Sequence, residues 1–179
     1  MPDIGQIVSE LYLVAGKRLG AYGYVLTGSQ HEGEELVQAA VVKTFVKRRQ
    51  LDNVGSAEAY VRATMRTMHV DRIRRDLTWR RLVPKVTRTE EQADASAAVD
   101  AHDQIARALA ALPPQVRAAV ALRFYDDMTV AQIAAQMRLA DGTVKQYLAQ
   151  GRAILAPLLG VGEHDVERVS VSVSERSRS

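Results

Sequence analysis

Apolar side chains recur every three or four residues along most of this chain, which is the period of an amphipathic helix. The amino-terminal part predicts three such helices. The first ends near Gly28, and the second starts at Ser29, with Glu32 three residues on as in a capping box. The third follows a short loop, is expected to have Ser56 as its N-cap, and continues to Arg81.

Four shorter helices are predicted in the carboxy-terminal part. The first stops at Pro113, and Pro114 suits the first turn of the next helix, where a missing N–H costs nothing. The third begins at Thr129, which forms a capping box with Gln132. The last follows a short turn and is expected to break near Pro157.

Between these two parts the helical period fails, and a stretch with a proline and many small polar residues predicts a flexible linker. We therefore predict an all-α fold of two small helical domains joined by that linker. The predicted limits are 1–81 for the first domain, 82–98 for the linker, 99–160 for the second domain and 161–179 for a disordered tail.

Composition narrows the class of protein. Apolar residues are 47% of the 179, enough for a core, and the absence of cysteine excludes disulfides and thiolate metal sites. The four histidines stand far apart, so we expect no metal and no cofactor. No apolar run approaches the roughly 20 residues needed to cross a bilayer, and the start lacks a basic leader, so we expect a cytoplasmic protein without membrane contact. The acidic pairs Glu34-Glu35 and Asp126-Asp127 have no nucleophile beside them, so neither an enzyme nor a small-molecule substrate is expected.

Gly16, Gly20 and Gly23 superficially resemble a phosphate-binding loop. No strand precedes them, however, and Lys17 and Arg18 interrupt the run. We interpret the three glycines as positions of close helix packing.

The charges are distributed unevenly, although the formal net charge is only +3. Residues 43–88 hold 13 basic and four acidic side chains, whereas residues 1–42 and 89–142 are both net acidic. A basic block between acidic ones indicates a surface that binds a polyanion. The alternative is an arginine-rich helix that is merely solvated.

Residues 129–152, TVAQIAAQMRLADGTVKQYLAQGR, have the pattern of a helix-turn-helix: a short helix, a tight turn and a second amphipathic helix. Ile133, Val144 and Leu148 are expected to hold the two helices together. Glutamine can bond an adenine edge, and lysine can bond guanine or phosphate. The candidate DNA-binding residues on the second helix are Thr143, Lys145, Gln146, Tyr147, Gln150 and Arg152. Helix pairs of this shape also occur as plain packing units.

At this point the chain resembles a known family. Residues 108–155 resemble domain 4 of bacterial sigma factors, and residues 24–75 resemble domain 2 through LTGSQHEGEELVQAAVVKTF and AEAYVRATMRTMHVDRIRR. The two blocks, in this order and with a short linker, are similar to the extracytoplasmic-function (ECF) sigma factors, the actinobacterial ones above all.

The resemblance implies promoter recognition and DNA melting together with core RNA polymerase, and an anti-sigma factor as regulator. It implies that core polymerase contacts the second helix through Glu34, Glu35, Leu36 and Gln38. It implies that the minus-ten element is bound, with one base flipped out, by Asp52, Asn53, Ser56, Arg62, Arg66, Arg72, Arg74 and Arg75. The helix-turn-helix would read the minus-thirty-five element.

The chain departs from the family pattern at several positions. Arg138 stands where glycine is common, in a turn where a left-handed arginine costs on the order of 1 kcal/mol. Gln146-Tyr147 replace a common Ser-Arg, and residues 149–151 hold no arginine, so the recognition helix is less cationic than usual. Thr67 stands where asparagine is usual, which affects one minus-ten contact.

Two other functions compete with the sigma-factor hypothesis. One is a stand-alone helix-turn-helix regulator that binds duplex DNA without polymerase, as a dimer at paired half-sites. The other is a sigma-like decoy that binds a protein and not DNA, and the weakly cationic recognition helix favours it. Of the single residues, Trp79 can stack on an unpaired base or act as a packing anchor, and we favour the anchor. Asp71 is either a guide for a DNA-binding arginine or part of a surface ion pair.

Overall fold

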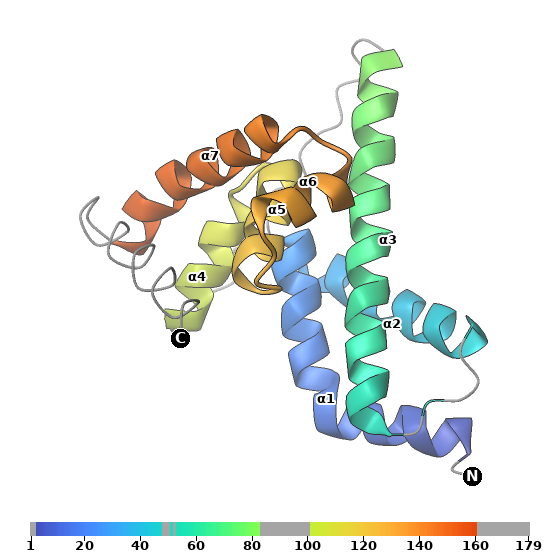
Figure 1. The fold of residues 1–179 in the computed structure, drawn as a ribbon. Helices are drawn as coiled ribbons and strands as arrows, with labels where there is room; N and C mark the ends of the chain where they lie inside the picture. Colours follow the sequence, from blue (N-terminus) through green and yellow to red (C-terminus); the bar gives the residue numbers. More distant parts are fainter. Residues whose placement is uncertain (1–2, 48–50, 52, 83–100, 161–179) are drawn as a thin grey trace, which may run out of the picture.

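The computed structural model describes residues 3–47, 51, 53–82 and 101–160. Every regular element in these residues is a helix, so the all-α prediction is confirmed. The helices are α1 (Ile4–Thr27), α2 (Gln30–Lys47), α3 (Val54–Leu82), α4 (Ala101–Ala110), α5 (Pro114–Phe124), α6 (Val130–Met137) and α7 (Asp141–Leu159) (Figure 1). The predicted linker beyond Leu82 and the predicted tail lie outside the described residues.

The helix ends follow the capping residues in most places. The Ser29 hydroxyl accepts a hydrogen bond from the Glu32 N–H at 3.4 Å, and Thr129 and Gln132 form both halves of a capping box. The prediction of Ser56 as N-cap was wrong: the Asn53 side-chain oxygen accepts from the Ser56 N–H at 2.9 Å, so α3 begins earlier, at Val54.

Pro157 does not end the last helix, which corrects the predicted break. α7 continues through it to Leu159, and Gly160 then ends the helix in a left-handed conformation (φ 65°). The N–H that proline lacks affects only the last turn of α7, where Pro157 is exposed.

α1 and α2 approach each other through glycine. A Cβ on Gly23 would lie 2.6 Å from the carbonyl oxygen of Gly33, so only a residue without a side chain allows this backbone contact. The packing role predicted for Gly23 is thus confirmed. It is wrong for Gly20, which has no such neighbour, and for Gly16, whose nearest neighbour is the Tyr12 ring at 3.8 Å.

α3 extends well beyond the helices around it, and its carboxy-terminal end projects clear of the rest of the fold (Figure 1). Val61 and Met65, on its first half, are fully buried. Trp79, near its end, is 67% exposed, so the packing role inferred for it was wrong within the described residues. Trp79 is exposed because α3 extends beyond the helices that pack against its first half (Figure 1).

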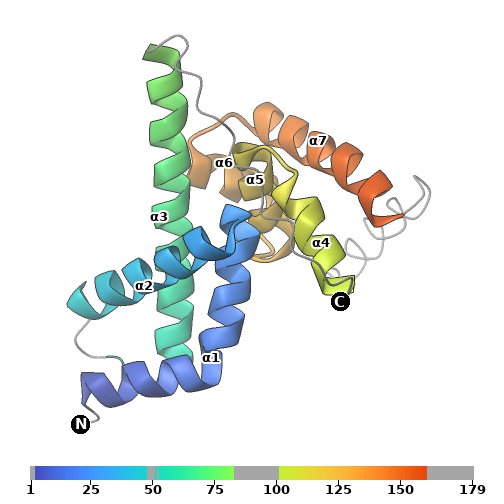
Figure 2. The same cartoon turned by 180° about the vertical axis from the view of Figure 1, so that it is seen from behind.

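Helices α4–α7 pack directly against helices α1–α3, an arrangement that the sequence does not predict. α5 and α6 lie beside α1 and α3 in both views (Figures 1 and 2). Leu19 and Leu26 of α1 share one buried apolar cluster with Leu112 and Val116. A second cluster joins Val70 and Ile73 of α3 to side chains of the other group, namely Leu122, Ile133, Met137 and Val144. The two helical groups therefore share their cores.

Candidate nucleic-acid interface

α7 presents a polar face away from the core. Val144 is fully buried against α5 and α6, which fixes the rotation of the helix about its axis. Lys145, Gln146, Gln150 and Arg152 are consequently exposed, as predicted for a helix that reads DNA.

Two of the predicted α7 residues lie closer to the protein. Thr143 is half-buried in the first turn, where its backbone N–H donates to the Ala140 carbonyl. Tyr147 is also half-buried and packs against both apolar clusters. The position of Tyr147 therefore favours a packing role over contact with a base.

The turn between α6 and α7 uses a strained arginine. Arg138 has φ 54° and ψ 51°, the left-handed region, where a non-glycine residue costs on the order of 1 kcal/mol. Its N–H donates to Ala134 and Ala135 carbonyls, and the Leu139 N–H donates to the Ala134 carbonyl at 2.9 Å. These bonds close α6 and direct the chain into α7.

Gly151 explains one departure from the family pattern. It is buried where α7 crosses α5, and a Cβ there would lie 2.6 Å from a methyl carbon of Val120. An arginine side chain at this position would have to displace α5. Close packing of α7 on α5 therefore accounts for the lack of an arginine at position 151.

All five predicted minus-ten arginines lie on α3 and already have partners within the chain. Arg72 pairs with Glu32 of α2 at 3.2 Å, and Arg74 pairs with Asp71 at 2.8 Å. Arg75 donates to the backbone carbonyl of Asp71. Of the two interpretations of Asp71, a helix ion pair is the one present here.

The other predicted minus-ten residues, around the start of α3, differ in their exposure to solvent. Asn53 is exposed but its amide oxygen caps the helix, and Ser56 is half-buried in the first turn. Asp52 lies outside the described residues. Thr67, where the family pattern has asparagine, is exposed and its hydroxyl donates to the Ala63 carbonyl.

A cluster of polar side chains joins α1, α3 and the turn after α5, and the sequence did not predict it. We call it the Asp126 cluster; it consists of Asp126, Tyr22, Arg62 and Arg66. The Tyr22 hydroxyl donates to one Asp126 carboxylate oxygen at 2.6 Å. The other oxygen lies 3.4 Å from an Arg66 nitrogen and 3.7 Å from an Arg62 nitrogen. The Arg62 guanidinium also stacks over the Tyr22 ring, 4.6 Å from its centroid.

The Asp126 cluster is largely removed from water. The Asp126 side chain is 8% exposed and Tyr22 is 1% exposed. Burial, followed by the hydrogen bond to Asp126, raises the pKa of Tyr22 well above its ordinary value. Asp126 and Tyr22 are 104 residues apart, so no local pattern could have indicated the contact.

A second buried contact between the helical groups centres on Arg117 of α5. Its guanidinium donates to the Thr27 carbonyl at the end of α1 and to the Leu112 carbonyl at 2.8 Å. Gly28 makes room for it, because a Cβ there would collide with the guanidinium. Burial, then the positive charges of Arg117 and Arg72, lowers the pKa of nearby His69 to about 4.

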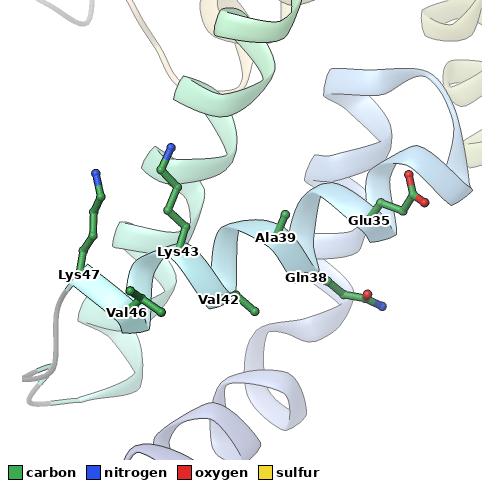
Figure 3. A pocket seen from close by; sticks show the side chains of 7 residues that line it. All are labelled: Glu35, Gln38, Ala39, Val42, Lys43, Val46 and Lys47. Carbon is green, nitrogen blue, oxygen red and sulfur yellow. The ribbon is translucent and has the colours of Figure 1, made fainter.

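The predicted polymerase-binding residues lie on α2. Glu34, Glu35 and Gln38 are exposed, whereas Leu36 is half-buried and packs onto the apolar core. A shallow depression along α2 is lined by Glu35, Gln38, Ala39, Val42, Lys43, Val46 and Lys47 (Figure 3).

Two valines in that depression were not predicted. Val42 is 64% and Val46 71% exposed, on the side of α2 to which Gln38 also points, and the two lysines extend the other way (Figure 3). Their spacing of four residues was a usable signal, since apolar side chains outside the core stripe of a helix indicate a contact surface.

The described residues bring together no group of three or more acidic or histidine side chains able to hold a metal ion. None of the described helices is long and apolar enough to cross a bilayer.

Comparison with known proteins identifies the family. The model for "Sigma-70, region 4" matches residues 102–155. The ECF RNA polymerase sigma factor SigL of Mycobacterium tuberculosis is 31% identical over 135 residues, which cover 73% of this chain and 76% of SigL. The RNA polymerase sigma-E factor of Streptomyces avermitilis is 27% identical over 152 residues, covering 82% of this chain and 80% of that protein.

A solved structure shares the fold. It is the sigma factor RpoE in complex with the anti-sigma factor NepR from Bartonella quintana, with a TM-score of 0.53 and 22% identity, covering 87% of this chain and 98% of that one. The 31% identity to SigL, over about three quarters of both chains, and the match to the region 4 model establish that the chain belongs to the family of ECF RNA polymerase sigma factors.

Proposed function

We propose that this protein binds core RNA polymerase, directs it to promoters and takes part in opening the DNA there. The observation that carries the proposal is the exposed polar face of α7, presented by a capped helix-turn-helix within the segment that matches sigma-70 region 4. We assign residues 1–81 and 99–160 as the two functional domains. The protein acts in the cytoplasm, without a cofactor and without catalysis of its own.

α7 is the proposed reader of the minus-thirty-five element. Gln146 and Gln150 can bond base edges, and Lys145 and Arg152 can bond guanine or phosphate from the same exposed face. Thr143 suits a phosphate, because it stands beside the free N–H groups at the start of the helix.

α3 is the proposed contact with the minus-ten region. Its arginines lie along a helix that projects from the fold, where they can follow a DNA backbone. The ion pairs of Arg72 and Arg74 are exposed or half-exposed, and such pairs contribute at most about 1 kcal/mol, so DNA phosphates can replace their acidic partners. Exposed Trp79 offers a ring on which an unpaired base can stack.

The α2 depression is the proposed docking surface for core polymerase. Val42 and Val46 supply an apolar centre, and Glu35 and Gln38 supply polar groups beside it (Figure 3). An anti-sigma factor is the proposed regulator, since the solved relative RpoE is described in complex with one.

Reconstitution with purified bacterial core RNA polymerase tests the proposal. We expect the protein to bind core and to start transcripts at defined positions on genomic fragments from its source organism. Absence of both core binding and specific starts would refute the proposal. Tight duplex binding by a dimer, with no effect of core, would instead support a stand-alone regulator.

A pair of matched variants tests the α2 surface. Val42→Asp places a charge in the apolar centre, and we expect at least a tenfold loss of core affinity in a pull-down titration. Ala111→Asp makes the same kind of change at an exposed position outside α2 and is the control. Equal core affinity of the two variants would exclude this surface.

A further inference from the structure

Thr78 of α3 differs from the other exposed hydroxyl groups of the protein in its neighbours. Among the described residues, the exposed serine and threonine side chains are Ser9, Thr67, Thr78 and Thr129. The Thr129 hydroxyl caps α6. Ser9 and Thr67 have no basic residue three or four positions away along their helices, whereas Thr78 has three arginines at these distances.

The three arginines lie on the same face of α3 as Thr78. Arg74 and Arg75 precede it by four and three positions, and Arg81 follows it by three; positions with this spacing are neighbours on a helix surface. Arg75 and Arg81 are exposed, and Arg74 is half-buried. The Thr78 hydroxyl donates to the Arg74 carbonyl at 2.9 Å. An exposed hydroxyl therefore stands among three guanidinium groups.

The end of α3 that carries Thr78 has few buried contacts. The last buried side chain of the helix is Ile73, five residues before Thr78. Trp79 and Leu82 are 67% and 71% exposed, and this end projects from the fold in both views (Figures 1 and 2). Local opening costs least where few apolar contacts hold a helix. The segment around Thr78 can therefore leave the helix and enter the active site of another enzyme.

We propose that Thr78 is a phosphorylation site, at which a serine/threonine protein kinase that selects acceptors beside arginine weakens the contact of α3 with DNA. In the reaction the Thr78 hydroxyl oxygen attacks the γ-phosphorus of ATP. A new O–P bond forms, and the bond from that phosphorus to the β,γ-bridging oxygen breaks. ADP leaves with the bonding electrons, and a carboxylate of the kinase takes the hydroxyl proton.

A phosphate on Thr78 competes with DNA for the same arginines. It carries a charge of about −2 near neutral pH and offers strong acceptor oxygens. Guanidinium groups donate the same charge-assisted hydrogen bonds to this phosphate as to a DNA phosphate. Arg74 and Arg75 are among the residues proposed to contact the minus-ten region, so this inference rests on the proposed function. The α2 depression is lined by other residues, and core affinity should not change.

The first measurement locates the phosphate. The full-length protein is incubated with ATP and with lysates of its source organism from growing and from stationary cells, and phosphorylated peptides are identified by mass spectrometry. We expect phosphate on Thr78 and none on Thr67, the exposed threonine of the same helix that has no arginine at helical spacing. No phosphate on Thr78, or as much on Thr67, would overturn the inference.

The second measurement tests what the phosphate does. Protein with phosphothreonine incorporated at position 78 is assembled with core polymerase, and promoter affinity is followed by anisotropy over a range of salt concentrations. We expect affinity to fall at least about tenfold at low salt. The slope of log affinity against log salt should be shallower by about 1.4, because two arginines each lose a phosphate contact worth about 0.7. Unchanged affinity and slope would overturn the inference.

Two substitutions support this measurement. Thr78→Glu supplies one negative charge beside the same arginines and should lower promoter affinity in the same direction, by less than the phosphate does. It carries the test if circular dichroism shows that the phosphorylated protein has lost its helices. Ser9→Glu places the same charge on α1, away from any arginine at helical spacing, and is the matched control. The control should bind promoter within about twofold of the wild type, and equal affinity of the two glutamate variants would contradict the proposed role of Thr78.

A double variant separates failure of this inference from failure of the proposed function. Arg74→Ala with Arg75→Ala should weaken promoter opening by the polymerase complex. If the double variant opens promoters normally, the proposed role of α3 fails. If it is impaired while the phosphorylated protein and Thr78→Glu bind promoter like the wild type, only the regulatory role of Thr78 fails.

Discussion

The two helices proposed to bind DNA, α3 and α7, differ in how their positive side chains are held. On α3, four arginines form ion pairs with acidic side chains, two of them across helical groups through Asp126. On α7, within the part of the chain that the structure describes, no acidic side chain pairs with Lys145 or Arg152. The face of α7 is ready for a ligand, whereas much of the basic surface of α3 is neutralised.

The difference shows that the net charge of a stretch of sequence does not tell how many of its basic side chains can bind a ligand. Residues 43–88 form the most basic block of the chain, yet four of its arginines are paired with acidic side chains. α7 carries fewer cations, but among the described residues none of its cations has an acidic partner. We therefore expect α7 to dominate DNA binding by the free protein, and α3 to contribute once the partners of its arginines are displaced.

The largest expected effect is on α7. Reversing both cations, with Lys145→Glu and Arg152→Glu, should lower the affinity of the free protein for duplex DNA by at least about a hundredfold at low salt, because two phosphate contacts become repulsive. Anisotropy with a labelled duplex measures it. The same reversal on α3, Arg74→Glu with Arg75→Glu, is the comparison and should cost the free protein less than tenfold. A greater loss from the α3 reversal would contradict the comparison.

The next largest effect is on the pH dependence of stability, through a histidine at the contact between the two helical groups. His69 is buried with a pKa of about 4, below the ordinary 6.5, so the folded state favours its neutral form. Its contribution to stability is complete above pH 6.5 and is lost as the pH falls toward 4. At about 1.4 kcal/mol per unit, the loss in unfolding free energy approaches 3 kcal/mol.

Denaturant unfolding between pH 7 and pH 4 measures this effect. His69→Gln should flatten the pH dependence, and His31→Gln, on the exposed face of α2, is the control. An unchanged slope in His69→Gln would show that His69 is not the group responsible.

The smallest effect concerns the turn that orients α7. Arg138→Gly relieves a left-handed arginine and should raise the unfolding free energy by about 0.5 to 1 kcal/mol, without loss of duplex binding. Gln136→Gly, inside α6, should lower it by about 1 kcal/mol. Thermal unfolding compares the two, and destabilisation by Arg138→Gly would mean that the turn is not strained.

The sequence predicts local structure well and long-range contacts poorly. The capping box at Thr129 and the first-turn proline at Pro114 were confirmed, because they depend on residues a few positions apart. The partners of Arg62 and Arg117 could not be predicted, since they join residues 64 and 90 positions apart through packing that no local pattern encodes. Tyr147 shows the same limit: its spacing allowed a DNA-facing position, and only the packing of α7 places it inward.

The central claim is that the free protein is closed, with its two helical groups packed on shared apolar clusters, and that the groups separate when the protein joins core polymerase. Because the chain has no cysteine, labels introduced at Ala59→Cys on α3 and Ala111→Cys before α5 allow energy transfer to report their separation. We predict high transfer in the free protein and a fall in transfer when core polymerase is added. Unchanged transfer in a complex that produces transcripts would contradict the claim.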